Sequence, residues 1–192
     1  MTVTKENKII AKTALNAFGG TPRVNKYWDD KNISNIDILV ATDRPGDGIT
    51  SYSTIGLSDY SIGYSVDEKP LRVEIVGSSA TIFEYFPNIL STCAFNIINT
   101  NLSIFHGEIF KGIIKMYYPD NEMEHVLFTS PFLWEEQLKT LDINEKKVAW
   151  LLAVPISSKE LLFAEKEGTE ALEDLFEKNE IDIFDIKRKS IL

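Results

Sequence analysis

The stretch EKKVAWLLAVPISSKELLFAEKEGTEALEDLF, residues 145–176, decides the fold because it joins a buried strand to two helices. Residues 148–154 are apolar almost without interruption, which predicts a strand covered on both faces and is too short for a membrane span. Pro155 has no amide N–H, so we expect the strand to end there. Ser157 and Glu160 have the spacing of a capping box, in which each side chain satisfies a free backbone N–H of the first helical turn. The stretch therefore predicts a core strand followed directly by a helix from Ser157.

A second helix is expected immediately after the first. Gly168 can adopt the left-handed conformation that ends many helices, and Thr169 can cap the next one. Leu172, Leu175 and Phe176 then have the three- and four-residue spacing of one buried stripe. Two short helices should therefore pack against the core.

The composition is that of one globular domain spanning residues 1–192. Of these 192 residues 44% are hydrophobic, enough to bury a core without disulfides or metal. The single cysteine, Cys93, lies in an apolar segment, so no intramolecular disulfide can form and a reducing compartment is expected. Residues 1–10 lack the apolar stretch of a signal peptide, and no long uncharged apolar run follows. We expect a cytoplasmic protein that does not enter the membrane.

The charge is strongly acidic and is concentrated near the carboxyl end. The formal net charge is -9, with a pI near 4.8, which argues against binding nucleic acid directly. Residues 157–185 contain ten acids and three bases, so this segment alone carries -7. Such a run is explained either by a solvated helical face or by an acidic surface that steers a basic protein into contact.

The amino-terminal third predicts a helix and a hairpin. Thr4 can cap a helix with one apolar stripe, ended by the glycines at 19 and 20. Residues 21–30 are polar and aromatic, which fits a loop or a short strand. Residues 36–41 and 50–57 are expected to be neighbouring strands. The RPGDG sequence between them favours a hairpin turn over a phosphate loop, because no Lys-Ser or Lys-Thr follows it.

The middle of the chain predicts further strands around one buried helix. Residues 71–76 alternate apolar with charged side chains, so Arg72 and Glu74 should share a solvated face. A helical period begins near Ser79, and Pro87 within it predicts either a kink or a short helix before the main one. Strands are expected within 104–118 and at 124–129, with a turn at 119–122. This order of elements predicts an α+β fold with helices packed on a mostly antiparallel sheet.

Catalytic and metal-binding motifs are absent from the sequence. His106 and His125 have no His-Glu-x-x-His or Cys-x-x-Cys companion, and we interpret both as surface or rim residues. There is no Gly-x-Ser-x-Gly, and Cys93 is interpreted as a core residue. The adjacent carboxylates Asp29 with Asp30, and Glu135 with Glu136, are expected to be solvated. No catalytic residue, metal ligand or cofactor is therefore assigned.

Several segments, taken in order, resemble the suppressor-of-fused domain family. They are Gly20-Thr21-Pro22-Arg23 with Tyr27, Trp28 and Asp29; residues 50–58, TSYSTIGLS; Arg72-Val73-Glu74-Ile75; Ser130-Pro131-Phe132; Val154-Pro155-Ile156-Ser157 with Glu160; and Asp185, Arg188 and Ser190. The matching family positions are Pro22, Arg23, Tyr52, Gly56, Arg72, Glu74, Pro155, Glu160 and Arg188, most of which have cap, turn or strand roles. We expect the polar ones, Arg23, Arg72, Glu74 and Arg188, to form one internal ion-pair network.

The resemblance implies an α+β domain that binds proteins and is not an enzyme. The short bacterial members of the family are commonly antitoxins, immunity proteins in bacterial competition, encoded beside secreted toxins. For this chain the resemblance implies a basic partner, the nuclease domain of a toxin of the LXG class. The expected contacts are acids of the terminal helices, Glu165, Glu167, Glu170, Glu173, Asp174 and Glu177. An exposed aromatic such as Tyr60, Tyr64 or Trp134 is expected to anchor the contact.

Two other hypotheses remain open. One is a general peptide- or protein-binding module of the same fold, which uses an exposed sheet edge for strand addition and has no toxin partner. The other is an enzyme with an unrecognised site. A secreted toxin encoded next to the chain favours immunity, whereas catalytic turnover favours the enzyme.

Overall fold

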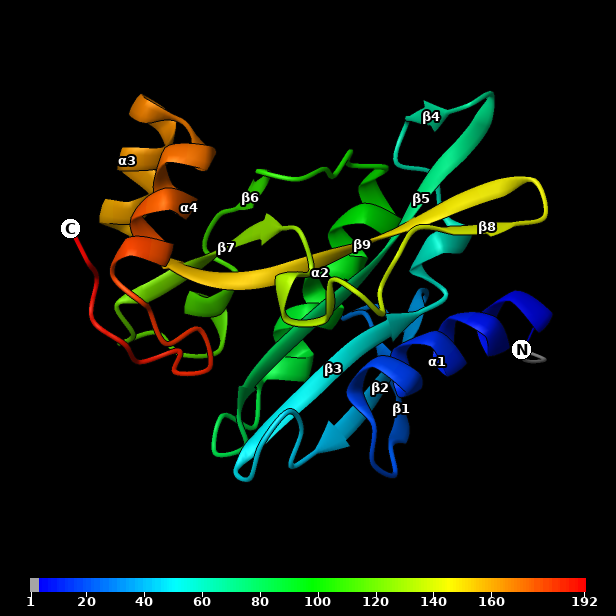
Figure 1. Ribbon diagram of the computed structural model, residues 1–192, viewed down its shortest axis with the longest axis horizontal. Coiled ribbons are helices and arrows are strands. Elements are labelled where there is room, and N and C mark those ends of the chain that lie inside the picture. Colours follow the sequence, from blue (N-terminus) through cyan, green and yellow to red (C-terminus); the bar gives the residue numbers. More distant parts are fainter. Residues whose placement is uncertain (1–3) are drawn as a thin grey trace.

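A mixed nine-stranded sheet is the frame of the molecule in the computed structural model, which describes residues 4–192 (Figure 1). Seven strands follow the order β1-β2-β3-β5-β9-β7-β6, with β4 beside β5 and β8 beside β9. The strands are β1 (Arg23–Trp28), β2 (Asn35–Thr42), β3 (Ile49–Ile55), β4 (Ser65–Val66), β5 (Lys69–Ala80), β6 (Ile109–Phe110), β7 (Met123–Thr129), β8 (Leu141–Ile143) and β9 (Lys146–Ser157).

Helices cover both faces of this sheet. They are α1 (Lys5–Phe18), α2 (Phe86–Thr100), α3 (Ser158–Glu167) and α4 (Thr169–Lys178), with short 3-10 helices η1 (Leu57–Asp59), η2 (Ile114–Met116) and η3 (Phe132–Trp134). The core on one face is built around α2, and the core on the other is built from α1, η3, α3 and α4. Figure 1 shows α3 and α4 at one end of the sheet and α1 at the other. The predicted α+β class is confirmed.

Strand β9 runs through the middle of the sheet, as the apolar run 148–154 predicts. It pairs in parallel with β5 and antiparallel with β7. Trp150 and Leu152 enter the core of α1 and α4, whereas Leu151 enters the core of α2. The prediction that Pro155 ends the strand is wrong, because β9 continues to Ser157. The pairing with β5 stops at Leu152, so within residues 4–192 Pro155 lies where one edge of β9 has no partner strand and a proline is tolerated.

The caps of the two carboxyl-terminal helices are local and mostly match the prediction. The Ser157 hydroxyl accepts from the Glu160 amide, and the Glu160 carboxylate accepts from the Ser157 amide, which completes the capping box. Gly168 is the residue that ends α3, as predicted, but its φ of 98° is combined with a ψ of 153°, which lies outside the left-handed helical conformation that the prediction assigned to it. Thr169 does not cap α4, however, because the helix begins at that residue and Gly168 holds the cap position.

The amino-terminal predictions are confirmed. Thr4 caps α1 by accepting from the Asn7 amide, and β2 and β3 form the expected hairpin around the RPGDG turn. Residues 21–30, expected to be a loop or a short strand, contain β1, an exposed strand at the edge of the sheet.

The prediction of a solvated face for residues 71–76 is wrong. Glu74 is fully buried and Arg72 is half-buried, because β5 lies near the centre of the sheet with cores on both faces. A carboxylate at such a position needs hydrogen-bond donors, and β3 together with η1 supplies them.

Two boundaries in the middle of the chain also differ from the prediction. Residue 79 still belongs to β5, and α2 begins at Phe86 with Pro87 in its first turn, so neither a kink nor a preceding α-helix occurs there. Within 104–118 the structure forms only the two-residue β6 and η2. The strand expected at 124–129 is confirmed as β7.

Between residues 4 and 192 no helix has both the length and the hydrophobicity needed to cross a membrane.

Candidate functional site

A groove between α4, η3 and the segment that follows α4 is the candidate binding site, and we call it the α4 groove. Its volume is about 700 Å³, within the range of small-molecule and peptide sites. Its lining residues are Thr129, Phe132, Leu133, Val154, Glu173, Asp174, Phe176, Glu177, Glu180, Ile181, Asp182, Ile183 and Phe184. Every charged residue in this lining is an acid.

The two sides of the groove differ in chemistry. On α4, Phe176 and Glu177 lie about one turn after Glu173, so the three side chains project along the same side of that helix. The opposite side is mainly apolar, with Phe132, which is 51% exposed, and Phe184 among its residues. The strands β7 and β9 close the groove from below.

Hydrogen bonds hold the segment after α4 in place. The Ile181 amide donates to the Phe176 carbonyl over 3.2 Å, and the Ala80 amide at the end of β5 donates to the Phe184 carbonyl over 2.8 Å. The Phe184 amide donates to Asp182 Oδ1 over 2.9 Å. The groove is therefore formed before any partner binds.

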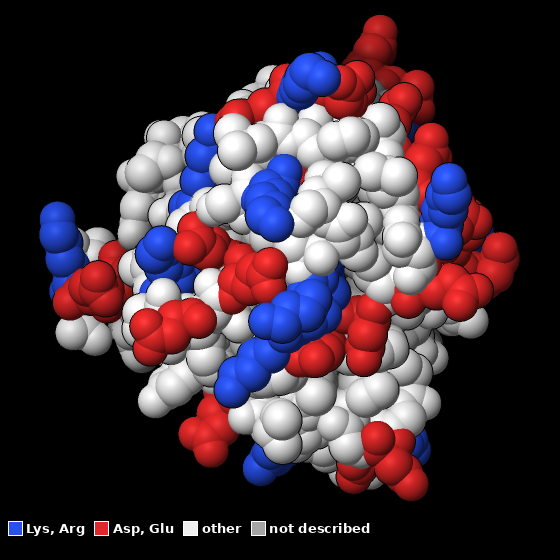
Figure 2. All heavy atoms as spheres, turned by 90° about the vertical axis from the view of Figure 1, so that its left-hand side faces the viewer, with Lys and Arg blue, Asp and Glu red and all other residues white. Residues whose placement is uncertain are grey.

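The six acids predicted to contact a partner separate into two groups. Glu173, Asp174 and Glu177 line the α4 groove, whereas Glu165, Glu167 and Glu170 do not. Glu165 lies 2.5 Å from the ammonium of Lys111, and Glu167 lies 2.6 Å from that of Lys166. Among the ion pairs of residues 4–192, none involves Asp174, Glu177 or Glu180. Figure 2 shows acidic side chains gathered along the upper and right-hand margins of this end of the molecule.

Glu173 is half-buried, whereas the other four acids of the described groove lining are exposed. Its Oε1 is shielded from water and lies 3.0 Å from His106 Nε2, without the alignment of a hydrogen bond. Burial raises the pKa of Glu173, the carboxylates of Glu170 and Asp174 add to this shift, and His106 opposes it. His106 is 43% exposed, which confirms its prediction as a rim residue.

The predicted aromatic anchors are not all available. Trp134 is buried, 4.5 Å from the Phe18 ring between centroids, so it cannot anchor a partner. Its apolar neighbours in η3 lie around the groove instead. Tyr64 is exposed and Tyr60 half-buried, and neither lines the α4 groove. Phe132 and Phe184 were missed because the sequence has no local signal that brings residues 132 and 184 together.

The carboxyl-terminal family positions form one buried cluster. Arg188 donates from Nη1 and Nη2 to the two oxygens of Glu160, over 2.7 and 2.8 Å. Its Nη2 also donates to the Pro155 carbonyl, and its guanidinium lies 5.2 Å from the Phe176 ring centroid. The Ser190 and Ser157 hydroxyls lie 2.8 Å apart. This cluster fixes the carboxyl-terminal segment against the start of α3.

A second cluster forms around Glu74 in the middle of β5. The carboxylate accepts from the Thr54 hydroxyl and from the amides of Gly56, Leu57 and Ser58. Gly56 has a φ of 97°, which turns these amides toward the carboxylate. Burial raises the pKa of Glu74, and the hydrogen bonds from Thr54, Ser58 and Gly56 oppose that shift.

The expected network of Arg23, Arg72, Glu74 and Arg188 does not form. Arg188 pairs with Glu160, Glu74 bonds to neutral donors, and the Nη1 of Arg72 donates to its neighbouring carbonyl. Arg23 is exposed on β1, next to the half-buried Pro22. The remaining family position, Tyr52, is buried with its ring centroid 5.3 Å from that of Phe86.

His125 is buried, contrary to the prediction of a surface residue, and lies beside Ser158 and Glu124. The Gly112 amide donates to His125 Nδ1 over 2.8 Å, which places the proton of the neutral ring on Nε2. This N–H faces the Ser158 hydroxyl at 3.0 Å, and Ser158 donates to Glu124 over 2.8 Å. The ring therefore cannot take the Ser158 proton, so this trio lacks the arrangement of a nucleophile and its base.

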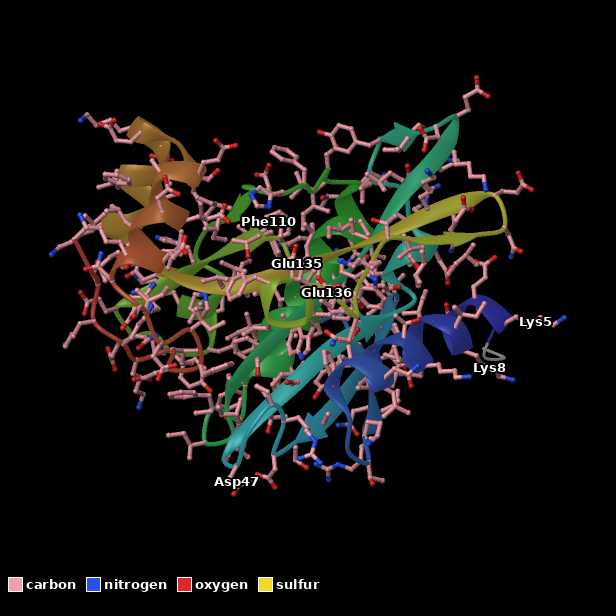
Figure 3. All side chains as sticks on the ribbon, viewed as in Figure 1. Lys5, Lys8, Asp47, Phe110, Glu135 and Glu136 are labelled. Carbon is pink, nitrogen blue, oxygen red and sulfur yellow. The ribbon has the colours of Figure 1, made fainter. Side chains whose placement is uncertain are left out.

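The other residues considered for chemistry have structural positions. Cys93 is buried in the core around α2, where burial raises the pKa of its thiol. Asp30 is exposed, whereas Asp29 accepts from the Ile33 amide and the Asn99 side chain in the turn after β1. The exposed Glu135 and Glu136 follow η3, as labelled in Figure 3. Within the described residues no three His, Cys, Asp or Glu side chains gather as a metal site.

Comparisons with known proteins agree on one family. A family model described as Suppressor of fused protein (SUFU) matches residues 33–189. The chain is 55% identical over 192 residues, the full length of both chains, to Immunity protein YqcF of Bacillus subtilis strain 168.

Solved structures share the fold at low sequence identity. A putative SUFU homologue from Neisseria gonorrhoeae FA 1090 has a TM-score of 0.70 and 16% identity, with 97% of each chain covered. A structure of the Sufu-Fu complex gives a TM-score of 0.67 and 13% identity, covering 96% of this chain and 91% of that one. Drosophila Suppressor of Fused gives 0.65 and 13%, covering 94% of this chain and 50% of that one. The family match, the full-length relative and the shared fold together establish that this chain belongs to the suppressor of fused family.

Proposed function

We propose that this protein is an immunity protein that neutralises a cognate secreted toxin by stoichiometric binding. The observation that carries the proposal is its 55% identity, over the full length of both chains, to an immunity protein. The preformed, acid-rimmed α4 groove supports it, because a binder that inhibits by occupancy needs a surface and no catalytic centre. We further propose that the partner is a toxin of the LXG class with a basic nuclease domain, and that the two proteins bind in the cytoplasm.

The proposed mechanism uses charge in two ways. The net charge of -9 attracts a basic domain over long range and raises the association rate. The acids of α3 and α4, including Glu165, Glu167 and Glu170 outside the groove, contribute to this steering. Contacts in the α4 groove then slow dissociation of the complex.

Co-expression with the toxin candidate encoded beside the chain tests the proposal. The expected result is cell survival with the intact immunity protein and death without it, together with a one-to-one complex of the purified proteins. Toxin activity should be inhibited only up to the molar equivalence point. Failure to rescue, or inhibition at far below equivalence, would sink the proposal.

Charge reversal tests the location of the interface. The combined substitutions Glu170→Lys, Glu173→Lys, Asp174→Lys and Glu177→Lys should lower the association rate at low salt by about tenfold or more. An unchanged association rate and salt dependence would place the interface elsewhere. Circular dichroism of the variant checks that α4 is intact.

The free edge of β1 favours one second candidate, a peptide-binding module that adds a strand to the sheet. Among the described strands β1 pairs only with β2, and Val24 and Trp28 on it are 53% and 51% exposed. Substitution of Val24 by proline would remove one edge amide, because the hydrogen-bonded pair of Asp29 and Ser34 and the alternation of the ladder place the Val24 amide on the side away from β2. If the proline substitution abolishes partner binding while the charge-reversed variant still binds, the peptide-binding module is favoured.

A further inference from the structure

We propose that the α4 groove binds an extended segment of the partner in which Lys or Arg residues alternate with apolar residues. This inference rests on the proposed function for the identity of the partner as a basic toxin. It goes beyond that function by committing to the backbone form and to the residue pattern of the segment.

The charges in the groove determine the first half of this pattern. Among the described residues five acids line it, at positions 173, 174, 177, 180 and 182, and no base does. Each of Asp174, Glu177 and Glu180 is exposed and takes no part in the ion pairs of the described residues. A cationic segment would meet these carboxylates without displacing a cation already in place.

Glu173 adds a specific contact for a cation. Its Oε1 is removed from water beside two further carboxylates, and its contact with His106 is not an aligned hydrogen bond. A buried acceptor without an aligned donor is unfavourable, and an incoming ammonium or guanidinium group would supply the donor. We therefore assign Glu173 as a cation-binding residue.

The spacing of the acids determines the backbone form of the occupant. Glu173 and Glu177 are four residues apart on α4, which separates them by about 6 Å along the helix axis. In an extended chain, side chains on one face recur every second residue, about 7 Å apart. Cations at every second position can thus contact successive acids of α4.

The opposite side of the groove determines the residues between the cations. In an extended chain the intervening side chains point the other way, toward η3 and the segment 181–184. There Phe132, Leu133, Ile183 and Phe184 offer apolar surface, and Asp182 is the one acid of the segment 181–184. Alternation in the segment therefore matches the division of the groove into an acidic and an apolar side.

Two seven-residue peptides provide a test that does not depend on the toxin. One alternates lysine with leucine, and the other has the same residues in two blocks, so both have the same charge and composition. Calorimetry with the full chain should show about tenfold tighter binding of the alternating peptide. Amide shifts in NMR spectra should concentrate at residues 173–184 and near Phe132. Equal affinity of the two peptides, or shifts elsewhere, would overturn the inference.

Matched variants separate groove contacts from long-range charge. Glu177→Gln with Glu180→Gln removes two exposed acids of the groove, and Glu167→Gln with Glu170→Gln removes two outside it. Both pairs change the net charge equally. The first pair should weaken peptide and toxin binding about tenfold, mainly through faster dissociation, and the second less than about twofold. Phe132→Ser should weaken binding as the first pair does.

The outcomes distinguish this inference from the proposed function. If the intact chain rescues cells but both variant pairs bind the toxin equally well, the groove assignment is wrong and immunity stands. If the toxin candidate is neither bound nor neutralised but the alternating peptide binds with the expected pattern, immunity fails and the groove assignment stands.

Discussion

Two carboxylates, Glu74 and Glu160, are fully buried, and the fold satisfies them in different ways. Glu74 accepts hydrogen bonds from one hydroxyl and three backbone amides, whereas Glu160 has the Arg188 guanidinium as a counter-ion. A buried acid with neutral donors organises the backbone around it. A buried acid with a cationic partner joins two segments of the chain.

Replacing Glu74 by glutamine should destabilise the protein by about 3 kcal/mol. The glutamine amide group places its own donors against the amides of Gly56, Leu57 and Ser58, which then lose an acceptor in a buried site. Urea denaturation measures the change in free energy of unfolding. The exposed Glu84→Gln is the matched control and should shift it by less than about 0.5 kcal/mol. Equal effects of the two changes would contradict the role given to Glu74.

Because of His125, the free energy of unfolding should decrease as the pH falls below neutral. Burial lowers its pKa from the ordinary value of 6.5, so the unfolded chain binds a proton that the folded chain does not. The stability that the neutral ring contributes is therefore fully present above pH 6.5. It is lost as the pH falls toward the lower pKa that His125 has in the folded protein. One proton limits the slope to about 1.4 kcal/mol per pH unit.

Comparison of the wild type with His125→Asn checks this pH dependence. The asparagine oxygen can accept from the Gly112 amide but does not titrate. The slope of unfolding free energy between about pH 5 and 6.5 should therefore be smaller in the variant. His106→Asn serves as the control, and the prediction fails if both variants keep the wild-type slope.

At the scale of elements, the carboxyl-terminal segment is tied to the start of α3 by the pair Glu160 and Arg188. Removing Arg188 as Arg188→Met leaves a buried carboxylate without its counter-ion and should cost about 4 kcal/mol. Adding Glu160→Gln should cost less than the sum of the single changes, which a double-mutant cycle measures. The exposed Lys187→Met is the control. Strict additivity would show that the pair is not coupled.

The packing of α2 on β5 depends on Gly77. A Cβ atom there would lie 2.7 Å from Cε1 of the fully buried Phe86 ring. Gly77→Ala should therefore destabilise the protein by about 2 kcal/mol. Gly46→Ala, where the added group meets no atom within 4 Å beyond the two neighbouring residues, should be nearly neutral in the same thermal unfolding measurement. A neutral Gly77→Ala would show that α2 can shift without cost.

At the scale of the whole molecule, charge sets how fast a basic partner arrives. The net charge of -9 is spread over many exposed acids, so its attraction is screened by salt. Raising the ionic strength from about 0.05 to 0.5 M should lower the association rate with the toxin about tenfold or more while changing dissociation much less. Stopped-flow fluorescence measures both rates. An association rate independent of salt would rule out electrostatic steering.

The sequence predicts what is local and misses what depends on distant neighbours. The capping box of Ser157 and Glu160 and the end of α3 at Gly168 are each encoded within a few residues, and both are confirmed. The burial of Glu74 depends on donors from β3 and η1, about twenty residues away, so alternation alone misplaces it. The parallel register of β5 with β9 likewise has no signature in either strand.

The candidate site shows the same division. The acids of α4 are evident in the sequence because they are concentrated on one short helix. Their grouping with Phe132 requires β7 to lie beside β9, which only the folded sheet provides. The sequence therefore predicts the charge of the site but not the groove or its apolar side.

The central position of β9 has a consequence for synthesis on the ribosome. Strands β1, β2, β3 and β5 can assemble from the first 80 residues, but the strand that joins them to β7 and β6 begins at residue 146. The edge of β5 that pairs with β9 therefore stays unpaired while more than sixty residues are translated. Non-local pairing of this kind slows folding and exposes the nascent chain to aggregation. Chaperone dependence of the newly made chain should therefore end only after β9 has left the exit tunnel.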